Sequence, residues 1–233
     1  MLAALIASMV STAQNTVIHD PNAQVRSVDN FHALKVATGI HLYFTQGSER
    51  AVAVSAASAE YRDRIRTEVK DGVLHIYYEN HWNWSFRDMM GKDLKVYVSS
   101  SLLDGLDASS GAEVEVEGTL KSANLALDFS SGARFSGKIA VENLQVDQSS
   151  GAHSTISGAA TLLKAEASSG SALHGYDLTV GQCSVSASSG GHVELTVEKE
   201  MTASASSGGH VNYQGGALLR DVHTGSGGSV SRR

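Results

Sequence analysis

The sequence is poor in cysteine, proline and charge. Its 233 residues include one cysteine and one proline, and charged residues make up 18% of the chain. Cys183 therefore has no partner for an internal disulfide. The formal net charge is -6 and no basic surface stands out, which argues against nucleic acid as a partner. No apolar run approaches the roughly 18 residues that a membrane-spanning helix needs, so we expect no transmembrane span.

Glycine, serine and alanine dominate long stretches, and the chain holds 23 glycines. Valine and leucine alternate through the same stretches, which is not typical of a disordered linker. A Ser-Ser-Gly triplet recurs in them at intervals of 18 to 21 residues. That interval is too short for a pair of helices and fits one coil of a β-solenoid. A degenerate copy stands at 225–227, and the complete triplets begin at Ser109, Ser130, Ser149, Ser168, Ser188 and Ser206.

Apolar and polar residues alternate when the coils are aligned on the triplet. Three residues before it stand Leu106, Leu127, Val146, Ala165, Val185, Ala203 and Val222. Three residues past its glycine stand Val114, Phe135, Ser154, Leu173, Val193, Val211 and Val230. This period of two predicts strands with one buried face. The predicted fold class is all-β, a single-stranded parallel β-helix (β-solenoid), with Cys183 as a small hydrophobic residue of its interior.

The triplet itself is predicted to be a corner. Counterparts in successive coils lie about 4.8 Å apart, so the chain must turn at the same place each time. Glycine adopts backbone angles that other residues avoid, and stacked serine hydroxyls can form a ladder. A nucleophilic serine would be unique and would have a base beside it, so we expect no catalytic role. The predicted corner residues are Ser109, Gly111, Ser130, Gly132, Ser149, Gly151, Ser168, Gly170, Ser188, Gly190, Ser206 and Gly208.

The chain divides into a leader, a linker and one domain. Residues 1–13 hold a short apolar run and a small-residue cleavage pattern, which predicts a signal peptide, short or truncated. The alternative is an ordinary apolar strand or helix. Residues 14–24 are a predicted linker, and 25–231 the predicted domain, with irregular coils at 25–101 and regular coils at 102–231. Export would place the protein in the periplasm, at the outer-membrane surface or outside the cell.

The irregular part contains three local predictions. Residues 57–69 favour a short helix with Ile65 and Val69 four residues apart. Asp71-Gly72 lies between two apolar runs and predicts a hairpin turn.

The third is an aromatic insert at 80–92, NHWNWSFRDMMGK. Its binding candidates are Trp82, Trp84 and Phe86, which would offer an aromatic platform to a sugar ring or a partner protein. The alternative is a flap that covers the core, because large aromatic side chains are usually buried.

Several segments together resemble a known family. The order is FHALKVATGI at 31–40, TQG at 45–47, DGVLHIYY at 71–78, KVYV at 95–98 and then the Ser-Ser-Gly coils. This order resembles the auto-transporter adhesin head domain, also called the head GIN domain, a family of formerly unknown function that is widespread in Bacteroidetes. The resemblance covers about 25–231. It implies a right-handed parallel β-helix that is exported to the periplasm or cell surface. The Gly-Ile-Asn signature corresponds to Gly39-Ile40-His41 here, so no site residue is carried over from it.

One polar column carries four carboxylates. Two residues before successive triplets stand Asp107, Asp128, Asp147 and Glu166. Like charges about 5 Å apart cost free energy unless they are screened, protonated or bridged by a cation. Calcium prefers oxygen ligands of this kind, so the column is a candidate cation ladder. The alternative is a solvated stripe that Lys121 and Lys164 partly neutralise.

A second polar column lies two residues past each glycine and holds His192 and His210. Two stacked imidazoles would suit zinc, but structural zinc takes four ligands and catalytic zinc three. Nothing in the sequence completes the set, so we expect an exposed polar ladder. The sequence predicts no cofactor.

These observations favour a non-enzymatic binding module over an enzyme. The module would present a flat stranded surface to a glycan or a cell-envelope protein, as an adhesin does, and its oligomeric state stays open. One alternative is a carbohydrate-active β-helix enzyme, either a lyase or a hydrolase, which would need an acidic cluster with a basic partner or paired carboxylates across a cleft. Another alternative is a signalling or assembly factor of the envelope.

Overall fold

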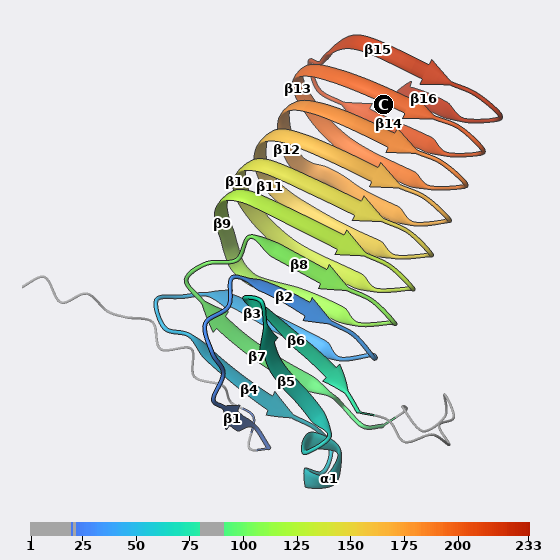
Figure 1. Ribbon diagram of the computed structural model, residues 1–233. Coiled ribbons are helices and arrows are strands. Elements are labelled where there is room, and N and C mark those ends of the chain that lie inside the picture. Colours follow the sequence, from blue (N-terminus) through green and yellow to red (C-terminus); the bar gives the residue numbers. More distant parts are fainter. Residues whose placement is uncertain (1–19, 21, 80–90) are drawn as a thin grey trace, which may run out of the picture.

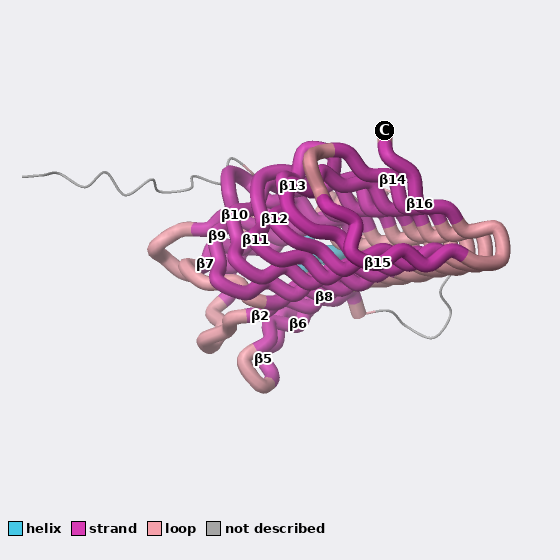
Figure 2. Tube along the Cα trace, turned by 90° about the horizontal axis from the view of Figure 1, so that it is seen from above, coloured by secondary structure: helices cyan, strands magenta, loops and turns pink. Residues whose placement is uncertain are grey.

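The protein is a right-handed β-solenoid of about seven turns (Figures 1 and 2). The computed structural model describes residues 20, 22–79 and 91–233. Its elements are β1 (Gln24–Arg26), β2 (Ala33–Val36), β3 (His41–Gln46), β4 (Ala51–Ser55), α1 (Ala59–Arg62), β5 (Ile65–Lys70), β6 (Val73–Tyr78), β7 (Lys95–Ser100), β8 (Gly105–Ala108), β9 (Glu113–Phe129), β10 (Arg134–Gln148), β11 (His153–Ala167), β12 (Ala172–Ala187), β13 (His192–Ala205), β14 (His210–Gln214), β15 (Leu218–Thr224) and β16 (Ser229–Arg232). No helix among these described residues is long and apolar enough to cross a membrane.

Each regular coil has two faces joined by one bent strand. The first halves of β9 to β13 form face 1, together with β3, β7, β14 and β16. The second halves of the same strands form face 2, together with β2, β6, β8 and β15. The strands bend at one edge of the flattened coil, and the Ser-Ser-Gly corners return the chain at the other (Figure 2). Each face therefore presents outward side chains in straight columns along the coil axis.

The interior columns follow the alternation in the sequence. Leu106 pairs in register with Leu127, which pairs with Val146, and all three are buried. Cys183 is also buried, and burial raises the pKa of its thiol to about 12. It is therefore a protonated core residue rather than a reactive thiolate.

The core contains a polar defect between coils. Gln148 is 4% exposed, and neither its amide oxygen nor its amide nitrogen has a hydrogen-bond partner. Its column neighbours are Phe129 and Ala167. The buried hydroxyl of Ser154 also has no partner. A buried polar group without a partner costs about 1–3 kcal/mol of stability.

Replacing Gln148 with methionine is therefore expected to raise the free energy of unfolding by about 1–2 kcal/mol. Methionine has a similar length and no group that needs a hydrogen bond. Urea denaturation followed by circular dichroism measures the change. Gln145→Met is the matched control, because Gln145 is exposed and donates to Asp147. A loss of stability in Gln148→Met would show that the amide is hydrogen-bonded in solution.

The N-terminal coils are closed by antiparallel strands. β2, β3, β6, β7 and β8 pair in parallel with the coils above them, whereas β1 pairs with β4, β4 with β7 and β5 with β6 in antiparallel register. Figure 1 shows these antiparallel strands with α1 below the coils. They cover this end of the solenoid with a different pairing from that of the repeats.

The helix predicted at 57–69 is only four residues long. Ser58 caps α1, with its hydroxyl accepting from the N–H of Tyr61 at 3.3 Å. Ile65 and Val69 lie on β5 instead, so the prediction that they share a helical face is wrong. The antiparallel partner β6 provides cross-strand pairing that overrides the weak local helical pattern. Asp71-Gly72 forms the expected two-residue hairpin turn, with φ of 52° and 77°.

The last coil lies open. Leu219 and Val222 are in register with the buried column residues Met201 and Ala203, yet each is 38% exposed. Among the described residues, β15 pairs only with β13, and β16 only with β14. The end that carries the C-terminus therefore shows core positions and free strand edges.

Candidate binding surfaces

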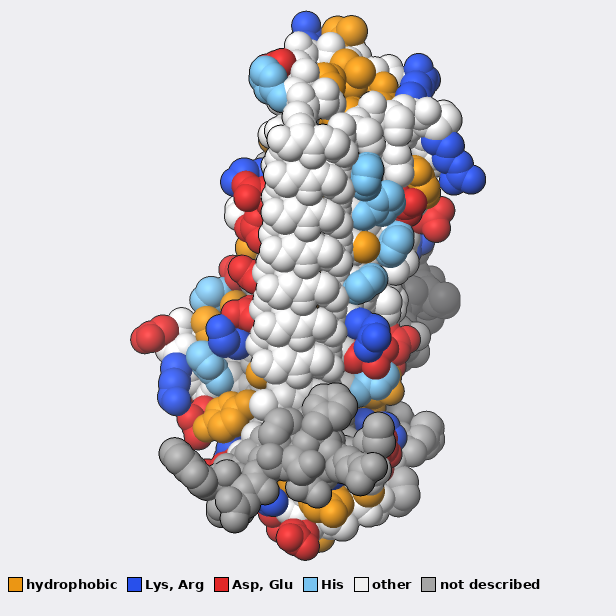
Figure 3. Space-filling model, turned by 90° about the vertical axis from the view of Figure 1, so that its right-hand side faces the viewer, with side chains coloured by type: hydrophobic (Ala, Val, Ile, Leu, Met, Phe, Trp, Pro, Cys, Tyr) orange, Lys and Arg blue, Asp and Glu red, His pale blue; other side chains and the backbone are white. Residues whose placement is uncertain are grey.

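The Ser-Ser-Gly corners stack along one edge as a continuous column (Figure 3). Each is a four-residue turn in which the N–H of the fourth residue donates to the carbonyl of the first, as Ala152 does to Ser149 at 3.1 Å. The second serine and the glycine both have left-handed backbones, with φ of 52° at Ser150 and 72° at Gly151. Positive φ at both central positions is the signature of a type I′ turn. Sequence reasoning assigned this conformation to glycine alone.

Backbone groups join one corner to the next. The glycine N–H of each triplet donates to the carbonyl of the second serine in the following coil, as Gly151 does to Ser169 at 3.1 Å. Within the described residues, no hydrogen bond links the hydroxyls of two triplets. The ladder expected of the side chains is therefore a ladder of peptide groups, and the hydroxyls stay free for solvent or a ligand.

We call this stack of triplets the corner ridge. It carries no charged side chain, and the φ angles of its second serines differ by only a few degrees, from 49° to 53°. The ridge therefore repeats one geometry at the coil spacing of about 4.8 Å. Its exposed second serines are Ser110, Ser131, Ser150, Ser169, Ser189 and Ser207.

The acidic column lies on face 2, beside the ridge. Asp107, Asp128, Asp147 and Glu166 stand opposite one another in consecutive coils. The amine of Lys35, one coil earlier, lies 2.5 Å from the Asp107 carboxylate. This pair neutralises one end of the column.

The middle of the column is the least neutralised. Desolvation, and then the like charges of Asp107 and Asp147, raise the pKa of Asp128. Lys164 lies 2.9 Å from Glu166, as expected, but Lys35 rather than Lys121 provides the other cation. No group of three or more His, Cys, Asp or Glu side chains in the described part of the chain is arranged to hold a metal ion. A cation ladder along this column stays a prediction.

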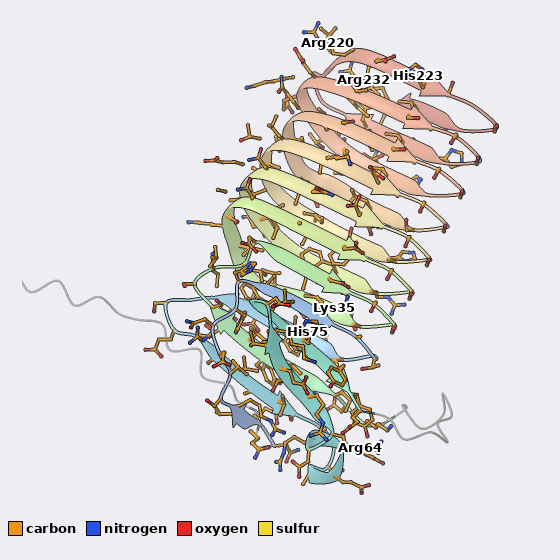
Figure 4. The ribbon with its side chains drawn as sticks, viewed as in Figure 1. Lys35, Arg64, His75, Arg220, His223 and Arg232 are labelled. Carbon is orange, nitrogen blue, oxygen red and sulfur yellow. The ribbon has the colours of Figure 1, made fainter. Side chains whose placement is uncertain are left out.

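An open groove of about 430 Å³ runs beside the acidic column. Its lining includes the small residues Ala33, Gly105 and Ala126. Lys35 and His75 lie at its N-terminal end, on β2 and β6 (Figure 4).

Histidines gather on face 1, across the ridge from the acids (Figure 3). His192 and His210 are adjacent in register, with ring centroids 6.5 Å apart. The carboxylate of Glu194 contacts two rings, His174 Nδ1 at 2.9 Å and His192 Nε2 at 3.2 Å. Burial acts to raise the pKa of Glu194, but hydrogen bonds from the two histidines outweigh it and lower that pKa. The sequence alignment pairs His192 with His210 but misses His174 and Glu194. Each of these two residues lies two positions further along its strand than the first column does, and so also points outward. This period of two was the signal that could have found them.

The aromatic candidates Trp82, Trp84 and Phe86 lie outside the described residues, as does the predicted signal peptide at 1–13. Their roles stay predictions.

Residues 30–217 match the family model described as "Putative auto-transporter adhesin, head GIN domain". No curated protein matches the chain.

Several solved structures share the fold. A putative adhesin from Bacteroides fragilis superposes with a TM-score of 0.81 at 16% identity, over 91% of this chain and 96% of that one. A putative adhesin from Parabacteroides distasonis gives 0.69 at 19% identity, over 91% and 96%. One from Parabacteroides merdae gives 0.67 at 15% identity, over 91% and 95%.

Proposed function

Because the chain belongs to the family described as "Putative auto-transporter adhesin, head GIN domain", we propose that it is an exported, non-enzymatic binding module of the cell envelope. Its corner ridge is the recognition surface, and a glycan or an envelope protein is the partner. The observation that carries this proposal is the constancy of the ridge, where φ of the exposed second serines stays between 49° and 53° over six coils.

The physical basis is preorganisation. Backbone hydrogen bonds hold every turn to the next, so the ridge loses little conformational entropy when it binds. The free serine hydroxyls both donate and accept hydrogen bonds, which suits a partner with hydroxyl or amide groups. The absence of charge on the ridge favours a neutral partner surface at this position.

A glycan array probed with wild type and two matched variants tests the proposal. The ridge variant is Ser131→Asn/Ser150→Asn/Ser169→Asn, because asparagine tolerates the left-handed backbone and adds bulk without charge. The control is Ala123→Asn/Glu142→Asn/Thr161→Asn at the opposite, bent edge. We expect the ridge variant to bind at least about tenfold more weakly and the control to bind as wild type.

Two results would contradict the proposal. If the ridge variant binds as well as wild type, the binding site does not lie on the ridge. If wild type depolymerises any member of a polysaccharide panel, the protein is an enzyme. Trp82→Ala/Trp84→Ala, on the same array, separately tests the aromatic insert.

A further inference from the structure

Four histidines line the flank of the ridge on face 1. We call His153, His174, His192 and His210 the histidine flank. His153, His192 and His210 share one column with Arg134 and Ala172, and His174 lies in the next column beside Glu194. Ring centroids are 6.4 Å apart for His174 and His192, and 6.5 Å for His192 and His210. Figure 3 shows histidines at successive heights beside the uncharged ridge.

The contacts of these rings leave room for a second proton on each. His153 Nδ1 lies 2.9 Å from the carbonyl of Gly151, and His210 Nδ1 lies 2.8 Å from the hydroxyl of Ser229. His174 and His192 both contact the Glu194 carboxylate. A carbonyl and a carboxylate accept hydrogen bonds from ring N–H groups, so they are compatible with imidazolium.

Within the coils that carry the flank, the other charges of its two columns cancel when the histidines are neutral. Its two columns from Arg134 to Ser229 and from Ser136 to Ser231 hold Arg134 and Glu194 as their other charged groups. Glu113 precedes Arg134 in the first column, and Glu115 precedes Ser136 in the second. Lys138 and Asp177, of opposite sign, follow along the strands. Protonation of all four rings therefore takes these two columns from about zero to about four positive charges.

The histidine flank would change from about neutral to cationic on one face of an acidic protein. The acidic column lies across the ridge on face 2 (Figure 3), and the whole chain has a formal charge of -6 with neutral histidines. Histidine gains or loses its charge between about pH 5 and 8, so a cationic stripe on an acidic protein exists only at mildly acidic pH. The stripe places one histidine in each of four successive coils, with His174 offset into the next column. This regular placement fits a linear polymer with regularly placed anionic groups.

We propose that the histidine flank binds a linear polysaccharide carrying acidic groups at mildly acidic pH and releases it at neutral pH. The inference rests on the proposed function, since it names a partner class and a regulation for a binding module. Nucleic acid fits less well, because these two columns hold one arginine and no phenylalanine, tyrosine or tryptophan on which a base would stack.

Binding to immobilised polygalacturonate tests the proposal, at low salt with a chelator present, at about pH 5.5 and about pH 7.5. We expect wild type to bind at least about tenfold more tightly at the lower pH. His153→Gln/His192→Gln/His210→Gln is expected to remove that difference. His32→Gln/His75→Gln/His223→Gln replaces the same number of histidines outside the flank, and is expected to keep it. Circular dichroism melting confirms that each variant is folded.

The proposal would be overturned by no binding, by equal binding at both pH values, by equal loss in the two triple variants, or by equal binding to neutral dextran. Tighter binding to a single-stranded DNA of equal charge would replace the polysaccharide with nucleic acid, which also overturns it. Failure here is distinguishable from failure of the proposed function, because the ridge variant and the neutral glycans of the array do not involve the histidine flank.

Discussion

Replacing Phe129 with alanine is expected to lower the free energy of unfolding by about 3–5 kcal/mol. The Phe129 side chain is fully buried, and its ring stacks on Phe135 with centroids 5.1 Å apart. Its neighbours in the column are Ala108 and Gln148, a small residue and an unbonded amide. Neither can fill the space that the ring would leave, so the cavity would persist.

The effect is expected to be local before it is global. Each coil of a solenoid contacts only its neighbours. A cavity between two coils therefore weakens the interface between the coils that precede it and the coils that follow it. We therefore expect urea denaturation of Phe129→Ala to show two transitions where wild type shows one.

Leu102→Ala is the control, because Leu102 is a large hydrophobic residue that is 48% exposed. Its stability should stay within about 0.5 kcal/mol of wild type. The double variant Phe129→Ala/Phe135→Ala should lose less than the sum of the single losses, since the rings contact each other. A single wild-type-like transition in Phe129→Ala would contradict the packing described here.

Gly191→Ala is expected to cost about 1–3 kcal/mol, toward the upper end of that range. A Cβ at Gly191 would lie 2.2 Å from the carbonyl oxygen of Ala167 and 3.0 Å from the backbone nitrogen of Ser168, in the preceding coil. That oxygen accepts the N–H of Ser188 at 2.9 Å, a bond between coils. Alanine would therefore disturb backbone atoms that cannot rotate away.

Two neighbouring changes separate this clash from general effects. Ala152 is the counterpart of Gly191 two corners earlier, at the triplet that begins at Ser149, and its methyl group is buried. Ala152→Gly should cost no more than about 1 kcal/mol. A Cβ at Gly190 would lie 4.0 Å from the backbone nitrogen of Gly170 and would not clash, but its φ of 75° makes Gly190→Ala cost roughly 1–2 kcal/mol. Denaturation of the three variants under one set of conditions gives the order, and wild-type stability in Gly191→Ala would mean that the corner relaxes to the geometry of Ala152.

The repeat made most of the fold predictable from the sequence. Triplet spacing and alternation are periodic signals that the coils share, so the columns through Leu127 and through Asp128 could be aligned without coordinates. The pairing of Lys35 with Asp107 could not, because Lys35 precedes the first triplet and reaches the column only through the parallel pairing of β2 with β8. The irregular coils pair with strands far away in the sequence, and this pairing produces no repeat pattern from which it could be predicted.

The site was predictable to a similar limit. His192 and His210 share an offset from the glycine, so their adjacency followed from the alignment. His174 lies two residues further along its strand, and only the coordinates show that Glu194 joins it to His192. The left-handed backbone of the second serine in each corner could not be predicted either, because serine rarely adopts a positive φ.

The uncovered final coil makes the length of the molecule an adjustable property. Each unit meets the next through the same backbone bonds, and the edges of β15 and β16 offer those bonds again. Duplication of one 19-residue unit, such as 149–167, would extend the stack by about 4.8 Å without altering the contacts of the others. The length of such a molecule can thus change in discrete steps, by gain or loss of whole units.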